Sequence, residues 1–162
     1  MMARKAVIGA GSVDEITDAL LAASRQLVAV SARSIAHVDE TITITQFRTL
    51  VILSTRGPSK VAALAADLEV QPSTAGRMVE RLIAARLVDR NPNPESRREL
   101  IIELTGRGRD VVDAVTARRR QEIAAIVRRM PDGDRSGLVR ALSAFSAAGS
   151  PVTGGEPDGY RW

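Results

Sequence analysis

The chain lacks cysteine and has a single histidine, His37, among its 162 residues. Without cysteine, thiolate catalysis, cysteine-ligated zinc and thiol-based redox sensing are excluded. One histidine leaves little scope for a histidine-rich metal site, and no serine–histidine–aspartate set, supported carboxylate pair or phosphate-binding loop is present. We therefore expect a protein that is not an enzyme and that uses neither a metal nor a cofactor.

Aromatic residues are also scarce, with only Phe47, Phe145, Tyr160 and Trp162 present. Proteins that bind single-stranded nucleic acid usually stack bases on aromatic side chains, so this class of protein is disfavoured. No segment approaches the roughly 20 apolar residues of a membrane span, and the apolar run near the N-terminus is too short for the core of a signal peptide. We expect a cytoplasmic protein with no membrane partner.

Arginine, by contrast, is abundant: it supplies 21 of the 23 basic residues, and the net charge is +4. The guanidinium group makes paired hydrogen bonds with phosphates and with guanine edges, so this composition favours a polyanionic partner. Apolar residues make up 44% of the chain and charged residues 26%, which is typical of a globular protein. The length suits one compact domain.

The spacing of apolar residues predicts a mainly α-helical chain with one small β-hairpin. We expect helices at residues 16–38, 46–55, 60–68, 72–85, 106–130 and 134–148, and strands at 87–90 and 100–104. Capping side chains precede several of these helices, and we expect Ser12 or Asp14, Thr45, Ser59 and Thr105 in this role. Residues 91–96 are rich in asparagine and proline and should form the turn of the hairpin.

These segments predict one domain over residues 13–148, between a flexible N-terminus at 1–12 and a flexible tail at 149–162. A short helix, a three-residue turn, a second helix and a hairpin in succession are typical of a winged helix-turn-helix. We expect this core at about residues 45–105. The long apolar stripes at 13–38 and 106–148 exceed what one small winged domain can cover, so these helices should form a dimer.

The predicted helix at 72–85 is the one expected to enter the major groove of DNA. At about 100° per residue, one side of this helix is apolar and should be buried through Ala75, Met78, Val79 and Leu82. The opposite side carries Ser73, Arg77 and Glu80, flanked by Thr74, Gly76 and Arg81. Its hydroxyls and guanidiniums suit contacts with base edges and phosphates. Because a mid-helix glycine costs about 1 kcal/mol relative to alanine, Gly76 either lets another backbone approach closely or is a tolerated small residue.

Further arginines follow along the predicted hairpin. Arg86 precedes its first strand, Arg90 lies on that strand, and Arg97 and Arg98 follow the turn, where they can reach the minor groove. Between residues 71 and 109 there are eight arginines and five acids, so most of the net charge of the chain lies in this segment. This is the electrostatic pattern of a DNA-binding surface.

The segment LAADLEVQPSTAGRMVERLIAARLVDRNPNPESRRELIIELTGRG resembles the core of the multiple-antibiotic-resistance regulator (MarR) family, and the similarity extends over residues 14–148. Three motifs carry it together: the helix VQPSTAGRMVERL, the strand LVDR, and the exit from the hairpin, RR followed by LTGRG. The resemblance implies a homodimer whose first, fifth and sixth helices interlock. It implies recognition residues at Ser73, Thr74 and Arg77 and wing contacts from Arg97 and Arg98. It also implies a small effector ligand, often aromatic or anionic, that lowers the affinity for the operator.

Two positions depart from the family pattern. Where the family often has aspartate just before the wing arginines, this chain has Ser96 preceded by Glu95, so either Glu95 braces the wing or the wing is looser. Where the family often has glycine after the recognition helix, Arg86 offers a further phosphate contact.

The sequence thus predicts a transcription regulator, more specifically a repressor, that binds a pseudo-palindromic site on double-stranded DNA as a homodimer. Two alternatives stay open. The basic charge also suits a nonspecific nucleoid-type DNA binder, and a winged helix can instead serve as a protein-interaction module, although Arg77 and Arg81 argue against the second.

Overall fold

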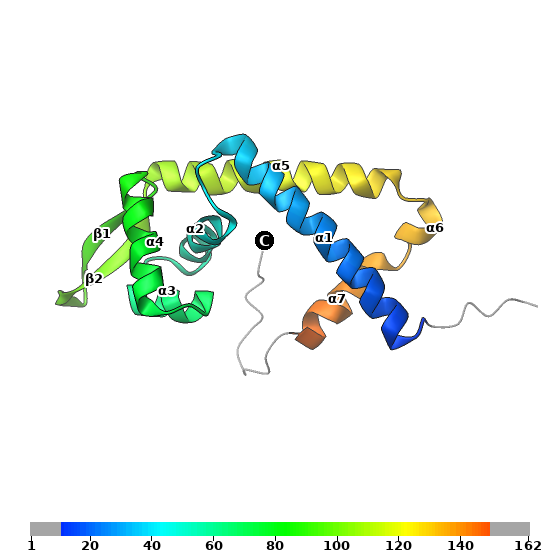
Figure 1. Ribbon diagram of the computed structural model, residues 1–162, viewed down its shortest axis with the longest axis horizontal. Helices are drawn as coiled ribbons and strands as arrows, with labels where there is room; N and C mark the ends of the chain where they lie inside the picture. Colours follow the sequence, from blue (N-terminus) through cyan, green and yellow to red (C-terminus); the bar gives the residue numbers. More distant parts are fainter. Residues whose placement is uncertain (1–10, 150–162) are drawn as a thin grey trace, which may run out of the picture.

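The computed structural model describes residues 11–149, so most of the two segments expected to be flexible lies outside the described residues, at 1–10 and 150–162. The predicted fold class is confirmed: the described chain is mainly helical, with one antiparallel hairpin (Figure 1). The elements are α1 (Val13–Val38), α2 (Ile44–Arg56), α3 (Val61–Leu68), α4 (Pro72–Ala84), β1 (Val88–Asn93), β2 (Ser96–Leu104), α5 (Gly106–Arg129), α6 (Asp132–Arg135) and α7 (Leu138–Gly149).

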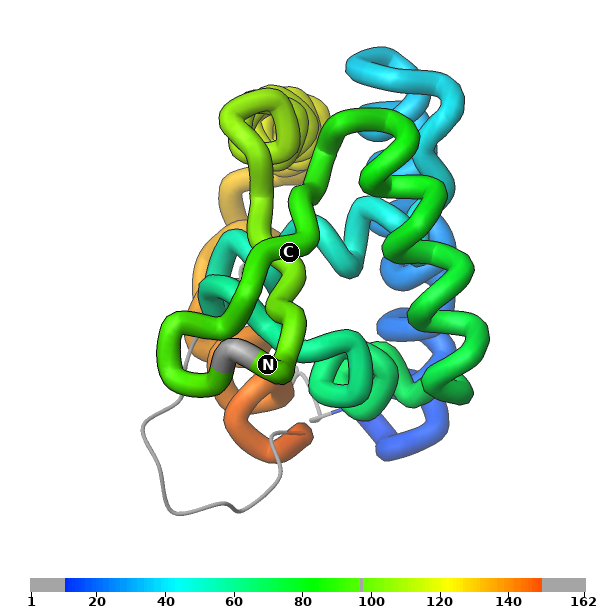
Figure 2. The backbone as a smooth tube through the Cα atoms, turned by 90° about the vertical axis from the view of Figure 1, so that its left-hand side faces the viewer, coloured from blue at the N-terminus to red at the C-terminus, as the bar shows by residue number. Residues whose placement is uncertain are grey.

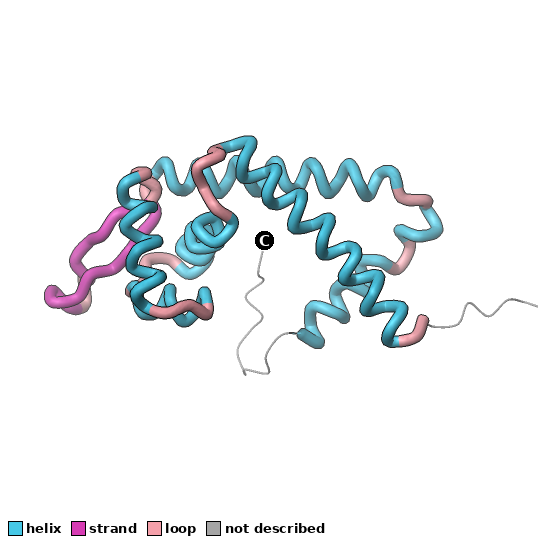
Figure 3. Tube along the Cα trace, in the orientation of Figure 1, coloured by secondary structure: helices cyan, strands magenta, loops and turns pink. Residues whose placement is uncertain are grey.

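Two groups of elements lie at opposite ends of an elongated molecule (Figures 1 and 3). α2, α3, α4 and the hairpin gather at one end, and α6 and α7 lie at the other. α5 runs between the two groups, and its 24 residues span about 36 Å at 1.5 Å per residue. α1 crosses α5 and packs against it. α5 therefore joins the helix-turn-helix to α6 and α7, and it is itself one of the helices expected to form a dimer.

The predicted caps hold for α1 and α5. Ser12 caps α1 in a reciprocal pair: the Glu15 N–H donates to the Ser12 hydroxyl at 3.2 Å, and the Ser12 N–H donates to the Glu15 carboxylate at 2.7 Å. Thr105 caps α5, where its hydroxyl accepts a hydrogen bond from the Gly108 N–H at 2.9 Å. Each cap satisfies a backbone donor that the helix itself cannot pair.

The predicted caps of α2 and α3 are wrong. α2 is capped by Thr43 and not by Thr45, because Gln46 lies three residues after Thr43 and completes a reciprocal pair with it. α3 begins after Lys60, which makes no capping side-chain hydrogen bond. Ser59 has a different role, since its backbone pairs with Ile102 of β2 through hydrogen bonds of 2.8 and 2.9 Å.

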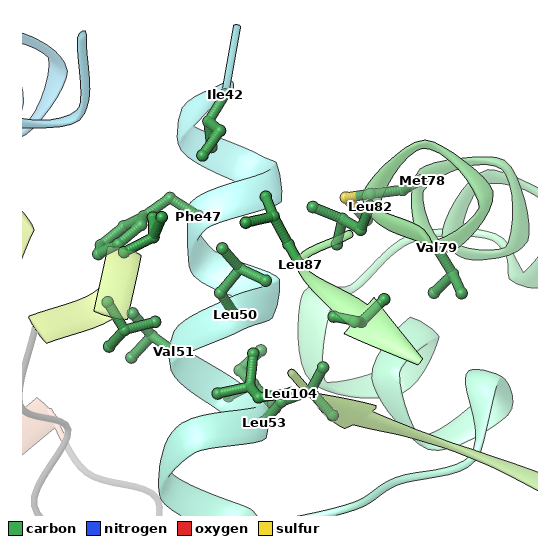
Figure 4. Packing of buried hydrophobic residues seen from close by; sticks show 14 of the residues in the cluster. Ile42, Phe47, Leu50, Val51, Leu53, Met78, Val79, Leu82, Leu87 and Leu104 are labelled. Atoms are coloured by element: carbon green, nitrogen blue, oxygen red, sulfur yellow. The ribbon is translucent and has the colours of Figure 1, made fainter. Parts of the chain in front are cut away.

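Helix α2 lies at the centre of the hydrophobic core. Leu50 is fully buried, and Figure 4 shows it next to Leu87 in the middle of the cluster, with Met78 and Leu82 of α4 to one side. The buried face predicted for α4 is confirmed, since Ala75, Met78, Val79 and Leu82 are at most 8% exposed. Each fully buried leucine stabilises the fold by about 1.5–3 kcal/mol relative to an exposed one. The core therefore fixes which side of α4 faces outward.

The hairpin is longer than predicted. Asn91, Asn93 and Ser96 belong to the strands, and only Pro94 and Glu95 remain in the turn. β1 is an edge strand, so Pro92, which has no N–H to donate, is tolerated there without loss of the β1–β2 ladder. The register pairs Val88 with Leu104 and Pro92 with Leu100, and it shifts between Pro92 and Asn93.

The single helix predicted at 134–148 is two helices. Gly137 has a φ of +83° and separates the four-residue α6 from α7. Glycine enters this left-handed region without steric cost, so it can break a helical pattern. Gly149, expected to begin the tail, is the last residue of α7. None of the helices between residues 11 and 149 is both long and apolar enough to cross a lipid bilayer.

Candidate nucleic-acid interface

The turn between α3 and α4 places the first turn of α4 at the surface. Glu69 ends α3 in the left-handed conformation, with a φ of +56°. Pro72 begins α4, where its missing N–H has no partner to lose. The N–H groups of Thr74 and Ala75 both donate to the carbonyl oxygen of Gln71, at 2.9 and 3.1 Å. The expectation of a three-residue turn with proline at the start of the second helix is thus confirmed.

The outward side of α4 carries the predicted contact groups. Its exposed residues are Ser73, Thr74, Arg77, Glu80 and Arg81. Gly76 is half-buried, and apart from its chain neighbours and the backbone of its own helix, no atom lies within 4 Å of the position that a Cβ would take there. The space beside Gly76 is therefore open, as the close approach of another molecule's backbone requires.

The hairpin lies beside α4 at the same end of the molecule, and Figure 2 shows the two side by side. Arg98 of β2 is exposed. Arg97 precedes it on the same strand, and its side chain is not among those that the structure describes. The Glu95 N–H donates to Asn93 Oδ1 at 3.0 Å. Bracing of a wing arginine by the Glu95 carboxylate stays a prediction.

Both strands of the hairpin are tied to the helix-turn-helix by ion pairs. Arg90 of β1 pairs with Glu80 of α4. Glu99 of β2 pairs with Lys60, with 2.7 Å between Nζ and Oε2, and Asn93 also donates to Glu99 at 3.3 Å. The hydrogen bond from Lys60 is the main reason that the pKa of the Glu99 carboxyl lies below its ordinary value. Neither pair was predicted from the sequence, because their members lie 10 and 39 residues apart.

Arg86 forms the junction between α4 and β1. It adopts the left-handed conformation, with a φ of +58°, and its side chain is exposed. The carbonyl oxygen of Arg86 accepts a 2.8 Å hydrogen bond from the Thr105 hydroxyl, and the Leu87 N–H donates to the Leu82 carbonyl at 2.9 Å. The residue that usually suits this geometry is glycine. Here an arginine takes the position and adds a cation at the end of the recognition helix.

The nine residues predicted to contact DNA thus lie on two neighbouring elements and the junction between them. They are Ser73, Thr74, Gly76, Arg77 and Arg81 on α4, Arg86 in the junction, and Arg90, Arg97 and Arg98 on the hairpin. Arg90 lies on the hairpin, but its guanidinium is already paired with Glu80 of α4. Within residues 11–149 no three acidic or histidine side chains gather as a metal site would need.

Two sequence comparisons relate the chain to known proteins. A sequence model of the MarR family matches residues 42–100. The HTH-type transcriptional repressor NicR of Pseudomonas putida is 36% identical over 104 residues, which cover 64% of this chain and 66% of NicR. The chain thus spans just under two thirds of the length of this relative.

Solved structures extend the comparison to the whole fold. The crystal structure of RV1404 from Mycobacterium tuberculosis is 63% identical in sequence, with a TM-score of 0.83 over 90% of this chain and 99% of that one. A mutant of S. aureus MepR, solved with a bound oligodeoxyribonucleotide, is 16% identical and shares the fold, with a TM-score of 0.61 over 86% and 99% of the two chains. By its sequence matches and its winged helix-turn-helix, the chain belongs to the MarR family of transcription regulators.

Proposed function

We propose that this protein is a repressor that binds a specific, pseudo-palindromic site on double-stranded DNA, as a homodimer in the cytoplasm. The observation that carries the proposal is the outward side of α4, with its hydroxyls and guanidiniums, beside an arginine-bearing hairpin. NicR is named as a transcriptional repressor, and MepR has been solved with a bound oligodeoxyribonucleotide, which supports the same role. Such a protein acts by binding and not by catalysis.

In this proposal α4 enters the major groove. Ser73, Thr74 and Arg77 contact base edges from its first two turns, and the open space at Gly76 lets the DNA backbone come close. A bidentate contact between arginine and guanine discriminates against a wrong base by about 1–3 kcal/mol. Arg77 is therefore the residue that we expect to contribute most to sequence preference.

The remaining arginines set the register of the protein on the duplex. Arg81 and Arg86, near the C-terminal end of α4, are placed to contact phosphates. Arg97 and Arg98 reach from the hairpin toward the minor groove, where the negative potential attracts guanidinium groups. Phosphate contacts add affinity for DNA of every sequence. Minor-groove contacts favour those DNA sequences whose minor groove is narrow.

Exposed apolar side chains on α1 and α7 support the homodimer. Ile16, Leu21, Leu27, Leu142 and Phe145 are between 42% and 58% exposed, and a largely apolar groove of about 560 Å³ lies between the two helices. Apolar patches of this kind on a soluble protein mark an interaction surface. A second copy of the chain presents the same helices and is the partner that we propose. Its recognition helix would then lie about 34 Å from the first, one turn of DNA away.

Selection of binding sites from a random duplex DNA library, at about 0.15 M salt, tests the proposal directly. We expect enrichment of an inverted repeat whose half-sites lie about one helical turn apart. Arg77→Ala should then weaken operator binding by about 1–3 kcal/mol and relax the preference at one base position. Arg120→Ala removes the same charge from an exposed position of α5, away from α4 and the hairpin, and serves as the control.

Other outcomes would select the alternatives. Binding without enrichment, with an affinity that falls with salt for every sequence alike, would establish the nonspecific nucleoid-type binder. Absence of DNA binding would favour the protein-interaction module. The small-molecule effector stays a prediction: it must bind two conformations with different affinity to have any effect. Titrating aromatic carboxylates into the operator complex tests it.

A further inference from the structure

Glu80 is an acid on the side of α4 that otherwise carries hydroxyls and guanidiniums. Its side chain is 60% exposed and lies one helical turn beyond Arg77. An unpaired carboxylate at this place would repel DNA phosphates and oppose binding to any sequence. A cation beside the carboxylate would offset this repulsion, and the structure shows one ion-pair partner for Glu80, which is Arg90.

Arg90 approaches Glu80 from the core-facing side of the hairpin. Residues alternate between the two faces of a strand, so Arg90 shares a face with the buried Val88 and points away from Asp89. It also lies opposite Ile102, which is fully buried. From this face Arg90 donates to the Glu80 carboxylate, and its own side chain is 35% exposed. The pair thus bridges the recognition helix and the first strand of the hairpin.

The second strand has a separate attachment to the other helix. Ser59 pairs with Ile102 by two backbone hydrogen bonds, and Lys60 pairs with Glu99. Both of these contacts lie at the start of α3, whereas Glu80 lies on α4. Each strand therefore makes an ion pair with a different part of the helix-turn-helix, and the Glu80–Arg90 pair joins β1 to α4 in addition to the packing between these two elements.

We propose that Glu80 and Arg90 are positioning residues: their ion pair sets the angle of the hairpin on α4 and thereby tunes the selectivity for the operator. The turn at Pro94 lies four residues beyond Arg90, a distance of about 13 Å in an extended strand. A rotation of about 10° at Arg90 would displace the turn by about 2 Å, which is enough to break hydrogen bonds made there. The effect on operator selectivity rests on the proposed function, whereas the effect on the geometry of the hairpin does not.

The first experiment needs no DNA. Amide hydrogen exchange of the hairpin is compared in the wild-type protein, Glu80→Gln, Arg90→Gln and the double variant. Asp89→Asn is the matched control, because it removes one negative charge from an exposed acid on the opposite face of the same strand. We expect the first three variants to speed exchange at residues 91–98 by the same amount, about fivefold, while Asp89→Asn leaves it unchanged. Equal exchange in Glu80→Gln and the control would overturn the positioning role, whatever the protein binds.

The second experiment measures affinity for the selected operator and for a scrambled duplex at several salt concentrations. We expect Glu80→Gln to lower the ratio of operator to scrambled affinity about fivefold, although the change removes a charge that repels DNA. Arg90→Gln and the double variant should lower the ratio equally, because one contact is lost in each case. Asp89→Asn should keep the ratio.

Three results would contradict the proposal. Tighter binding of Glu80→Gln to both duplexes would make Glu80 a simple repulsive charge. A drop of about one in the salt slope of Arg90→Gln on both duplexes would make Arg90 a phosphate contact. Additive losses in the double variant, with the loss for Glu80→Gln confined to one base position, would make Glu80 a base contact. If the wild-type protein selects no operator, the proposed function fails, while the exchange experiment still decides the geometry.

Discussion

The side-chain hydroxyl of Thr105 donates a 2.8 Å hydrogen bond to the backbone carbonyl of Arg86, 19 residues earlier in the chain. The same hydroxyl accepts from the Gly108 N–H as the cap of α5. One side chain therefore joins the end of the recognition helix to the start of the helix that runs to the far end of the molecule (Figure 1).

The first prediction concerns this hydroxyl. Thr105→Val keeps the shape of the side chain and removes both hydrogen bonds, so we expect it to lower the free energy of unfolding by about 1–2 kcal/mol. Thr105→Ser keeps the hydroxyl and is the control. Urea unfolding followed by circular dichroism measures both. Equal stability of the two variants would show that the hydroxyl contributes nothing.

The second prediction concerns the close contact at the same junction. Gly108 is buried, and a Cβ there would overlap the carbonyl oxygen of Leu87 and lie 3.1 Å from Leu104 Cδ2. Gly108→Ala should therefore lower the free energy of unfolding by about 2–3 kcal/mol, because the backbone of Leu87 cannot move aside freely. Gly106, in the first turn of α5, has no atom within 4 Å of its Cβ position other than those of its chain neighbours and its own helix backbone. Gly106→Ala should leave thermal stability within about 0.5 kcal/mol of wild type, and a similar loss in both variants would refute the steric argument.

The third prediction separates conformation from charge at Arg86. The backbone of Arg86 has a φ of +58°. This conformation destabilises a residue that has a Cβ by about 1–2 kcal/mol, but it does not destabilise glycine. Arg86→Gly should be more stable than Arg86→Ala by about 1 kcal/mol, since both variants lose the same guanidinium. Both should also lower the salt slope of DNA binding by about one, if Arg86 contacts a phosphate. Equal midpoints of unfolding for the two variants would contradict the conformational cost.

Local patterns explain what could be predicted from the sequence. The buried side of α4 follows from apolar spacing within 13 residues and from Pro72 at its start, so its position and outward side were predicted correctly. The cap of α2 was missed because Thr43 and Thr45 both precede the helix, and only the spacing to Gln46 distinguishes them. The break at Gly137 was missed because a single glycine costs a helix only about 1 kcal/mol and does not require a break.

Contacts between distant segments could not be predicted in this way. Lys60 and Glu99 lie 39 residues apart, and nothing near either of them in the sequence indicates the other. The same holds for the backbone pairing of Ser59 with Ile102. For the candidate site, the sequence placed the basic residues on the correct elements, but it did not show that Glu80 engages Arg90. The contacts of the nine residues with DNA stay predictions.

The fourth prediction is a pH dependence at the end of α1. Asp39 accepts hydrogen bonds from the Thr41 hydroxyl at 2.6 Å and from its N–H at 2.9 Å, and Arg107 of α5 lies 3.7 Å away. These contacts, the Thr41 hydroxyl first, hold the pKa of Asp39 below its ordinary value of 3.8. Because the pKa of Asp39 is lower in the folded protein than in the unfolded chain, its carboxylate stabilises the fold fully at a pH above the pKa of the unfolded chain. This stabilisation is lost as the pH falls through the pKa of the folded protein.

The Asp39→Asn variant has no carboxyl group at this position, so its stability serves as the reference for the wild-type protein. The difference in free energy of unfolding between wild type and Asp39→Asn should be constant between about pH 5 and 7, and it should shrink below about pH 4. Urea titrations at a series of pH values measure it. A difference that stays the same throughout the acidic range would show that the carboxylate is not stabilised by its neighbours.

The fifth prediction decides between the two interpretations of Gly76. The space beside it is open in the free protein, so Gly76→Ala should raise the free energy of unfolding by about 0.5–1 kcal/mol through helix propensity alone. If the DNA backbone approaches α4 at this point, the added methyl group must push it away, and operator affinity should fall even though the protein is more stable. Thermal unfolding and operator titration of the same variant give both values, so the gain in stability rules out misfolding as the cause of weaker binding. A variant that is more stable and binds the operator as tightly as wild type would make Gly76 a tolerated small residue, and it would place the DNA backbone farther from α4.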